Sequence, residues 1–303
     1  MSRSLEHALA RRPLLFEPVP PSVRADPVRA GLHTEALTRL LRGIPRLDAV
    51  NVPELVDENH DGRPYYRSGD PRRFARTVAE QAGCDAVVNK VVAHLASASA
   101  LTEWARETLA QGVRHAVLVG GSSRYIPYSG PTVAEADRIC EELFTPAGGL
   151  LGNIAIPQRT GEAHRMLAKT RAGARFFTTQ ILFDATAVLA MVREYGELCT
   201  REAVAPGAVL LSVAPLTDEA DCEFVRWLGA EVTDEAERRV LEPGAEGAAQ
   251  RATRLALDLW QEVRARAEQE RWPVPLGVNV EQISQRHLLA AAEMLGAFAH
   301  AVD

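Results

Sequence analysis

The sequence predicts an α/β fold, a single (β/α)8 TIM barrel that spans residues 1–303. Eight short apolar runs rich in Val, Ile and Leu alternate with longer amphipathic stretches, a pattern typical of βα units and a parallel sheet. The chain has 303 residues, of which 47% are hydrophobic, and one barrel of this size can bury a full core. An open doubly wound sheet usually carries a glycine-rich turn after its first strand, whereas here the first run leads into Pro18, Pro20 and Pro21.

The predicted strands and helices follow one another in order. The strands are expected at residues 14–17, 47–52, 86–91, 116–119, 153–156, 175–180, 208–213 and 275–280. The helices between them are expected at residues 34–41, 71–81, 100–110, 133–143, 161–171 and 185–195. Asp70 before Pro71 marks a helix start, because an aspartate caps free N–H groups and proline is tolerated at the first helical position.

Three segments depart from this simple alternation. Residues 52–70 and 120–131 are rich in polar residues, glycine and proline, and we expect long loops there, after strands two and four. Loops at the carboxyl ends of barrel strands are where ligands bind. Residues 218–270 hold additional helical sequence, so extra helices are expected between strands 7 and 8.

Composition excludes several classes of protein. The formal net charge of -6 leaves no excess of positive charge for a nucleic-acid partner. No apolar run has the length of a signal peptide or a membrane span, so we expect a cytoplasmic protein without a membrane partner. The four cysteines form no CxxC pair, the histidines form no metal motif, and no Gly-x-Ser-x-Gly elbow is present. We therefore expect no metal site and no covalent hydrolase chemistry.

Polar residues at the carboxyl ends of the predicted strands are the candidates for function, because a barrel of this kind projects its catalytic groups there. These residues are Glu17, Asn51, Glu54, Asn89, Lys90, Ser122, Gln158, Gln180 and Asn279. Glu17 lies between apolar residues and prolines that donate no backbone hydrogen bond, which disfavours the ionised carboxylate and raises its pKa. Such a carboxyl can donate a proton near neutral pH. An ordinary glutamate paired with an arginine is the alternative.

Three motifs are spread along the chain: Phe-Glu-Pro-Val-Pro-Pro at residues 16–21, Asp-Ala-Val-Asn-Val at residues 48–52, and Ala-Gly-Ala-Arg-Phe-Phe-Thr-Thr-Gln-Ile-Leu-Phe-Asp at residues 172–184. Together they resemble motifs of methylenetetrahydrofolate reductases. The third is the most specific, because it combines an Ala-Gly-Ala turn, a strand that ends in Thr-Gln, and an aromatic-aspartate pair. Residues 152–157 also resemble the fifth strand of that family.

The resemblance implies roles for individual residues. Glu17 matches the glutamate that protonates the folate as its methylene bridge opens, which leaves an iminium ion to receive hydride. Gln180 matches the glutamine that binds the pterin ring, and Phe183 matches an aromatic residue of the same pocket, although core packing is the alternative for Phe183. Asn51 and Glu54 are further candidates for holding the pterin or the amide of the cofactor, with ordinary loop hydrogen bonding as the alternative.

The chain departs from the family at positions that contact the flavin. An Arg-Gly-Asp element of the family is replaced by Gly120, Gly121 and Ser122, whose N–H groups are candidates for cofactor binding. A Tyr-Pro-Glu element is replaced by a segment that contains Gln158, and Lys169, with Arg165 and Arg171, is near enough in sequence to offer some positive charge. We therefore expect FAD binding to be weak or absent, and hydride to come directly from NADH or NADPH.

Two other functions remain open at this point. The first is a barrel that binds folate without reducing it and serves as a sensor or as a partner subunit. The second is a reductase of another pterin or iminium, or one that uses a deazaflavin donor. The sequence decides neither the choice between NADH and NADPH nor the oligomeric state.

Overall fold

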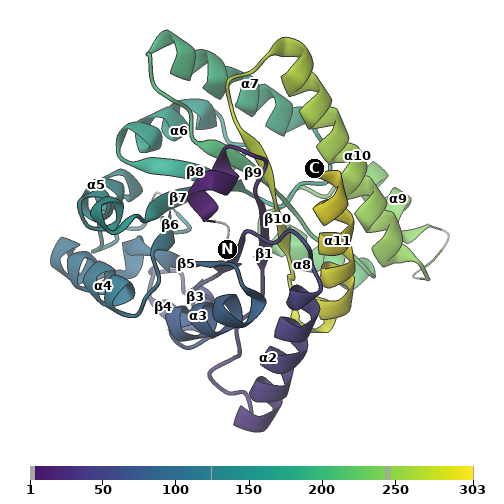
Figure 1. Ribbon diagram of the computed structural model, residues 1–303, viewed down its shortest axis with the longest axis horizontal. Coiled ribbons are helices and arrows are strands. Elements are labelled where there is room, and N and C mark those ends of the chain that lie inside the picture. The colour runs from purple at the N-terminus through teal and green to yellow at the C-terminus, as the bar shows by residue number, and fades with distance from the viewer. Residues whose placement is uncertain (1–3, 124, 243, 245, 303) are drawn as a thin grey trace.

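The computed structural model describes residues 4–123, 125–242, 244 and 246–302, and within them eight parallel strands close into a barrel (Figure 1). The barrel strands are β1 (Leu14–Glu17), β2 (Ala49–Val52), β5 (Asp85–Val91), β6 (His115–Val119), β7 (Leu150–Ala155), β8 (Ala174–Thr179), β9 (Ala208–Val213) and β10 (Leu276–Glu281). Their order around the barrel is β1-β10-β9-β8-β7-β6-β5-β2. The predicted (β/α)8 fold is confirmed.

Helices surround the barrel (Figure 1); they connect successive strands, except for the last one, which follows β10. They are α2 (Pro27–Arg42), α3 (Pro71–Ala82), α4 (Ala98–Ala110), α5 (Val133–Phe144), α6 (Glu162–Arg171), α7 (Thr186–Arg201) and α11 (Leu288–Ala301). The extra helices predicted between strands 7 and 8 are α8 (Glu219–Trp227), α9 (Asp234–Leu241) and α10 (Ala248–Glu270). Helix α3 begins as predicted, since the side chain of Asp70 accepts a hydrogen bond from Arg72 N and Pro71 follows the cap.

The bounds of several predicted elements differ from the structure. Helix α2, predicted at residues 34–41, begins at Pro27, and the last strand, predicted at residues 275–280, ends at Glu281. The fifth barrel strand, β7, begins at Leu150 rather than at residue 153, because Leu150 and Leu151 already pair with β6. Within the predicted loop 52–70, the short strands β3 (Val56–Glu58) and β4 (Pro64–Tyr66) form an antiparallel hairpin. The hairpin strands are only partly buried or exposed, so they lack the apolar alternation by which a strand is recognised in a sequence.

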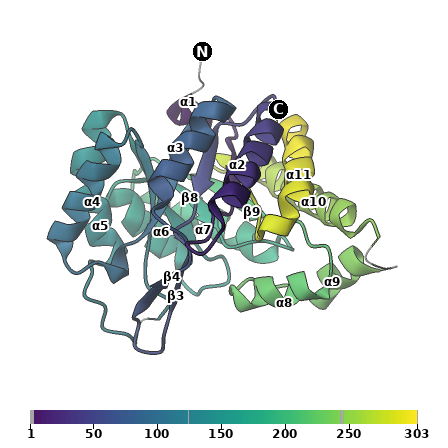
Figure 2. The same ribbon diagram turned by 90° about the horizontal axis from the view of Figure 1, so that it is seen from below.

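The half of the barrel interior near the amino-terminal ends of the strands is apolar. Side chains that point inward from the strands form one cluster with Leu5 of the short helix α1 (Leu5–Leu9): Leu15, Ala49, Val87, Val117, Phe176, Ala208 and Leu210. Gly152 on β7 leaves the space that the Phe176 ring occupies, since a Cβ there would lie 2.5 Å from the ring. Helix α1 therefore closes the amino-terminal end of the barrel, and Figure 2 shows it opposite the β3–β4 hairpin and α8.

A larger apolar core fills the space between the barrel and its helices. Its largest fully buried side chains include Trp260 of α10, Tyr195 of α7 and Phe298 of α11. Among the described helices, none combines the length and the apolar character that a membrane span requires.

Candidate active site

A cavity of about 730 Å³ lies at the carboxyl ends of the barrel strands. The segment that leads into the β3–β4 hairpin borders it on one side and α8 on the other, and Figure 2 shows both at the same end of the barrel. Of the candidate residues from the sequence, Glu17, Glu54 and Gln180 line this cavity. Its size and its position are those of ligand sites in this type of fold.

The Glu17 carboxyl lies between two asparagines on the strands that flank β1. Its Oε2 accepts hydrogen bonds from Asn51 Nδ2 of β2 at 2.7 Å and from Asn279 Nδ2 of β10 at 3.1 Å. Burial raises the pKa of Glu17 to about 7, and the two hydrogen bonds only partly oppose this rise. Glu17 is thus a carboxyl that can carry a proton near neutral pH and can release it into the cavity.

A layer of polar side chains crosses the barrel interior beside and beneath Glu17. Four of its buried oxygens have no hydrogen-bond partner among the described residues: Asn51 Oδ1, Asn89 Oδ1, Thr178 Oγ1 and Asn279 Oδ1. Asn279 Nδ2 also donates to Ser212 Oγ at 3.1 Å, which extends the layer to β9. Because buried acceptors are rarely left unpaired, this layer suits a ligand or solvent molecules that donate hydrogen bonds.

The Gln180 side chain joins the end of β8 to the end of α8. Its Nε2 donates to the carbonyl oxygen of Leu228 at 3.0 Å, and its Oε1 accepts from Ile181 N at 3.0 Å. The amide lies at the cavity wall, as the prediction requires, but both of its polar atoms already have partners. The amide still has a second N–H and a second oxygen lone pair, so Gln180 can bind a ligand in the cavity while it keeps both of these contacts.

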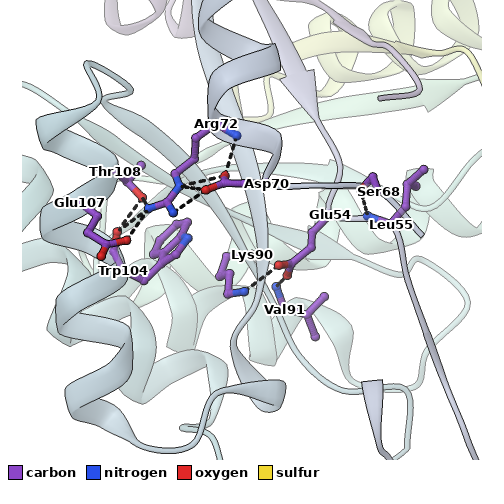
Figure 3. A network of polar contacts seen from close by, with 10 residues as sticks. All are labelled: Glu54, Leu55, Ser68, Asp70, Arg72, Lys90, Val91, Trp104, Glu107 and Thr108. Atoms are coloured by element: carbon purple, nitrogen blue, oxygen red, sulfur yellow. Dashed lines mark hydrogen bonds and ion pairs between the residues drawn. The ribbon is translucent and has the colours of Figure 1, made fainter. Parts of the chain in front are cut away.

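The Glu54 carboxylate holds the end of β5 against the segment that follows β2 (Figure 3). Its Oε1 pairs with Lys90 Nζ at 2.6 Å and its Oε2 accepts from Val91 N at 2.9 Å. The Lys90 ammonium also lies 5.8 Å from the centre of the Tyr66 ring on β4. Glu54 therefore holds the wall of the cavity beside the hairpin in place. Its predicted role in binding the pterin or the amide of the cofactor stays a prediction.

A second ion-pair network stands beside this one. The Arg72 guanidinium at the start of α3 pairs with Asp70 and reaches Glu107 and Thr108 of α4, at 3.2 Å and 3.3 Å (Figure 3). It is nearly buried, and it links the chain leaving the hairpin to two helices of the outer ring. The segment that follows the hairpin is therefore anchored to the outer ring of helices.

Phe183 does not reach the cavity that holds Glu17 and Gln180. It is buried in the main core and borders a separate, smaller cavity of about 210 Å³ that Asp184 and α9 also line. Its ring belongs to the main core and not to the cluster inside the barrel. Core packing, the alternative considered for this residue, describes its surroundings.

The predicted cofactor residues also lie apart from the cavity. Gly121 packs against the Tyr128 ring, since a Cβ at this position would lie only 2.2 Å from it. Ser122 Oγ donates to Glu58 Oε2 of the hairpin at 2.7 Å. Lys169 Nζ donates to the Ile154 carbonyl at 2.8 Å from the outer face of the barrel. Gly120 precedes this packed loop and contacts Val133, and Gln158 is exposed after β7. None of these residues is among the described residues that line the cavity.

Two features of the site were missed from the sequence. Glu281, the last residue of β10, lines the cavity and pairs in register with Glu17. Phe224 and Trp227 of α8 form a stacked aromatic wall, with ring centres 5.9 Å apart. Glu281 could have been found from the sequence, because Gly277, Asn279 and Glu281 alternate along one strand and share a face of it. No sequence signal places α8 over the barrel mouth.

Comparison with known proteins gives a similarity of fold. No protein-family model matches the chain, and no curated protein matches its sequence. A solved structure, described as an uncharacterized protein from Clostridium thermocellum that binds two copies of 5-methyl-5,6,7,8-tetrahydrofolic acid, is similar with a TM-score of 0.76. The similarity covers 97% of each chain at 13% sequence identity, so it establishes the shared barrel fold alone.

Proposed function

We propose that this barrel reduces 5,10-methylenetetrahydrofolate to 5-methyltetrahydrofolate with hydride from NADH or NADPH, and that Glu17 is the general acid. The observation that carries the proposal is the Glu17 carboxyl at the inner end of the cavity, with its pKa raised to about 7 by burial. A group that titrates near neutral pH is suited to proton transfer in a transition state.

The cavity supports a ligand of the tetrahydrofolate type. Its volume of about 730 Å³ lies within the range for drug-sized ligands. Phe224 and Trp227 offer aromatic faces, and the polar layer around Asn51 and Asn279 offers acceptors for the donor groups of a pterin ring. The structurally similar Clostridium thermocellum protein binds a methylated tetrahydrofolate, which adds support for the same ligand class.

The chemistry assigns one step to Glu17. Its proton goes to the bridging nitrogen that leaves the methylene carbon, and the C–N bond breaks. The other nitrogen then forms an iminium with that carbon. Hydride from the nicotinamide adds to the carbon to give the methyl group, and NAD(P)⁺ departs. Water returns the proton to the Glu17 carboxylate. The barrel contributes the contact between donor and acceptor, since positioning supplies much of the rate enhancement.

A flavin does not fit the residues that stand where the resemblance would place its contacts. The Ser122 hydroxyl is bound to Glu58, Gly121 is packed against Tyr128, and the Lys169 ammonium is bound to the Ile154 carbonyl. A flavin would have to displace each of these contacts. We therefore route no step through a flavin, and an absorbance spectrum of the purified protein with a stoichiometric flavin band would contradict this part of the proposal.

The decisive assay is anaerobic oxidation of NADH and of NADPH that depends on methylenetetrahydrofolate. Glu17→Gln should lower kcat by about 10²- to 10⁴-fold, the usual contribution of a general acid, with little change in folate affinity. Glu202→Gln makes the same chemical change at a surface ion pair with Arg171 and should leave kcat unaltered. If the protein binds 5-methyltetrahydrofolate in a calorimeter but shows no turnover in this assay, the reductase proposal is wrong and the protein is a folate-binding barrel.

A further inference from the structure

A second carboxyl, that of Glu281, stands beside Glu17 at the inner end of the cavity. Strands β1 and β10 are parallel neighbours, and Glu17 and Glu281 are register partners at their carboxyl ends. Residues in register on parallel strands point to the same face of the sheet, so both side chains enter the same cavity, which both line. The reaction proposed above uses only Glu17 and leaves this second acid without a role.

One asparagine connects the two carboxyls. Asn279 Nδ2 lies 3.1 Å from Glu17 Oε2 and 3.4 Å from Glu281 Oε1. Asn51 donates to Glu17 from the other side, and Ser212 donates to Glu281. All these donors are neutral, so they orient the carboxyls without neutralising a negative charge on either.

No cation among the described residues is paired with Glu17 or Glu281. The charged and titratable groups on the surrounding elements are joined to one another instead: Glu54 with Lys90, Asp57 with Arg67, and Asp221 with Arg286 and His287. Two ionised carboxylates at this position would therefore repel each other without a compensating positive charge.

This arrangement favours one proton held in common. Burial raises the pKa of both carboxyls, and the negative charge of Glu17 raises that of Glu281 further. The last proton of such a pair leaves at a higher pH than the proton of a single buried carboxyl, because its departure places two negative charges side by side.

We propose that Glu281 is a positioning residue that shares one proton with Glu17 and keeps it in the cavity at pH values at which a lone Glu17 would have lost it. The catalytic meaning of the pair rests on the proposed reduction, whereas the sharing of the proton does not. In that reaction the shared proton moves from Glu17 to the leaving nitrogen. The negative charge left on the pair stabilises the iminium cation through Glu17 until hydride arrives, after which water returns a proton.

The first test is the pH dependence of kcat for the wild type, Glu281→Gln and Glu281→Asp. Activity should fall on the alkaline side as the pair loses its last proton. In Glu281→Gln this decline should begin about one pH unit or more lower, since no second charge opposes ionisation of Glu17. Glu281→Asp keeps the charge and should restore most of the wild-type profile. Identical alkaline limbs for the wild type and Glu281→Gln would overturn the proposal.

The second test needs no turnover and therefore separates this inference from the proposed function. Infrared difference spectra of the ligand-free protein, recorded across the pH range, report protonated carboxyl groups through their C=O stretching band. We expect the wild type to keep a protonated carboxyl at pH 8, and its band to disappear about one pH unit or more lower in Glu17→Gln and in Glu281→Gln, because each variant removes the second negative charge. Circular dichroism establishes that each variant is folded. A folded wild type without this band at pH 8 would refute proton sharing, whatever the enzyme assay gives.

Discussion

Replacing Glu17 by Gln should stabilise the folded protein at alkaline pH while it removes the proposed acid. The pKa of Glu17 is raised in the folded protein by burial, so the carboxyl ionises more readily in the unfolded chain. Stability is then greatest below the unfolded pKa and falls as the pH rises towards the folded pKa. The amide of Gln keeps an oxygen for Asn51 and Asn279 and does not ionise.

The size of this effect follows from the two pKa values. A rise from 4.5 to about 7 corresponds to a penalty of roughly 3 kcal/mol once the group is fully ionised, at about 1.36 kcal/mol per pH unit. Glu17 is partly open to the cavity, and water there screens its charge, so we expect about 2 kcal/mol. Most of the loss should occur between pH 5 and pH 8.

Urea unfolding of the wild type and Glu17→Gln at pH 5 and at pH 8 measures this difference. The variant should have nearly the wild-type free energy of unfolding at pH 5 and exceed it by about 2 kcal/mol at pH 8. Glu202→Gln, at an exposed ion pair, should give no such change between the two pH values. A variant that differs from the wild type by the same amount at both pH values would show that burial of Glu17 does not penalise its ionisation.

Three further substitutions test other parts of the structure by the same unfolding assay. Gly152→Ala should lower stability by about 1–3 kcal/mol, because its methyl group would meet the Phe176 ring; unchanged stability would mean that the ring can move aside. Glu54→Gln should cost about 3 kcal/mol by leaving the nearly buried Lys90 ammonium uncompensated, and the Glu54→Gln/Lys90→Met double variant should regain part of that loss. Asp221→Asn should cost about 3 kcal/mol at pH 7, since its histidine and arginine partners hold the pKa of this buried carboxyl well below its ordinary value. That difference should shrink below about pH 4, as the aspartate takes up a proton, and a difference independent of pH would contradict this account.

The barrel could be predicted because its signal is local and repeated. Each buried parallel strand is a short apolar run, as in Ala208–Val213, and each returning helix has an apolar face. The hairpin could not be predicted, because Val56–Glu58 and Pro64–Tyr66 are short and bury little. Their pairing is supported by tertiary contacts such as the one between Glu58 and Ser122.

The candidate site was predictable only in part for a related reason. The rule that functional groups follow the strands selected Glu17 and Gln180, which the structure brings to one cavity. The same rule selected Gln158 and Ser122, which lie outside the cavity. The rule fails for them because it does not predict whether a loop turns towards the barrel axis or away from it. Glu281 was missed because the predicted last strand ended one residue too early.

The sequence by itself determined the eight-fold alternation, the strand that ends in Glu17 and the apolar neighbours that disfavour its charge, because these depend on residues close together in the chain. Only the tertiary structure decided that Glu281 faces Glu17, that Asn279 lies between them, and that α8 forms a wall of the cavity. Closure of the barrel makes the first and last strands neighbours, and no local pattern can carry a contact between residues 264 positions apart.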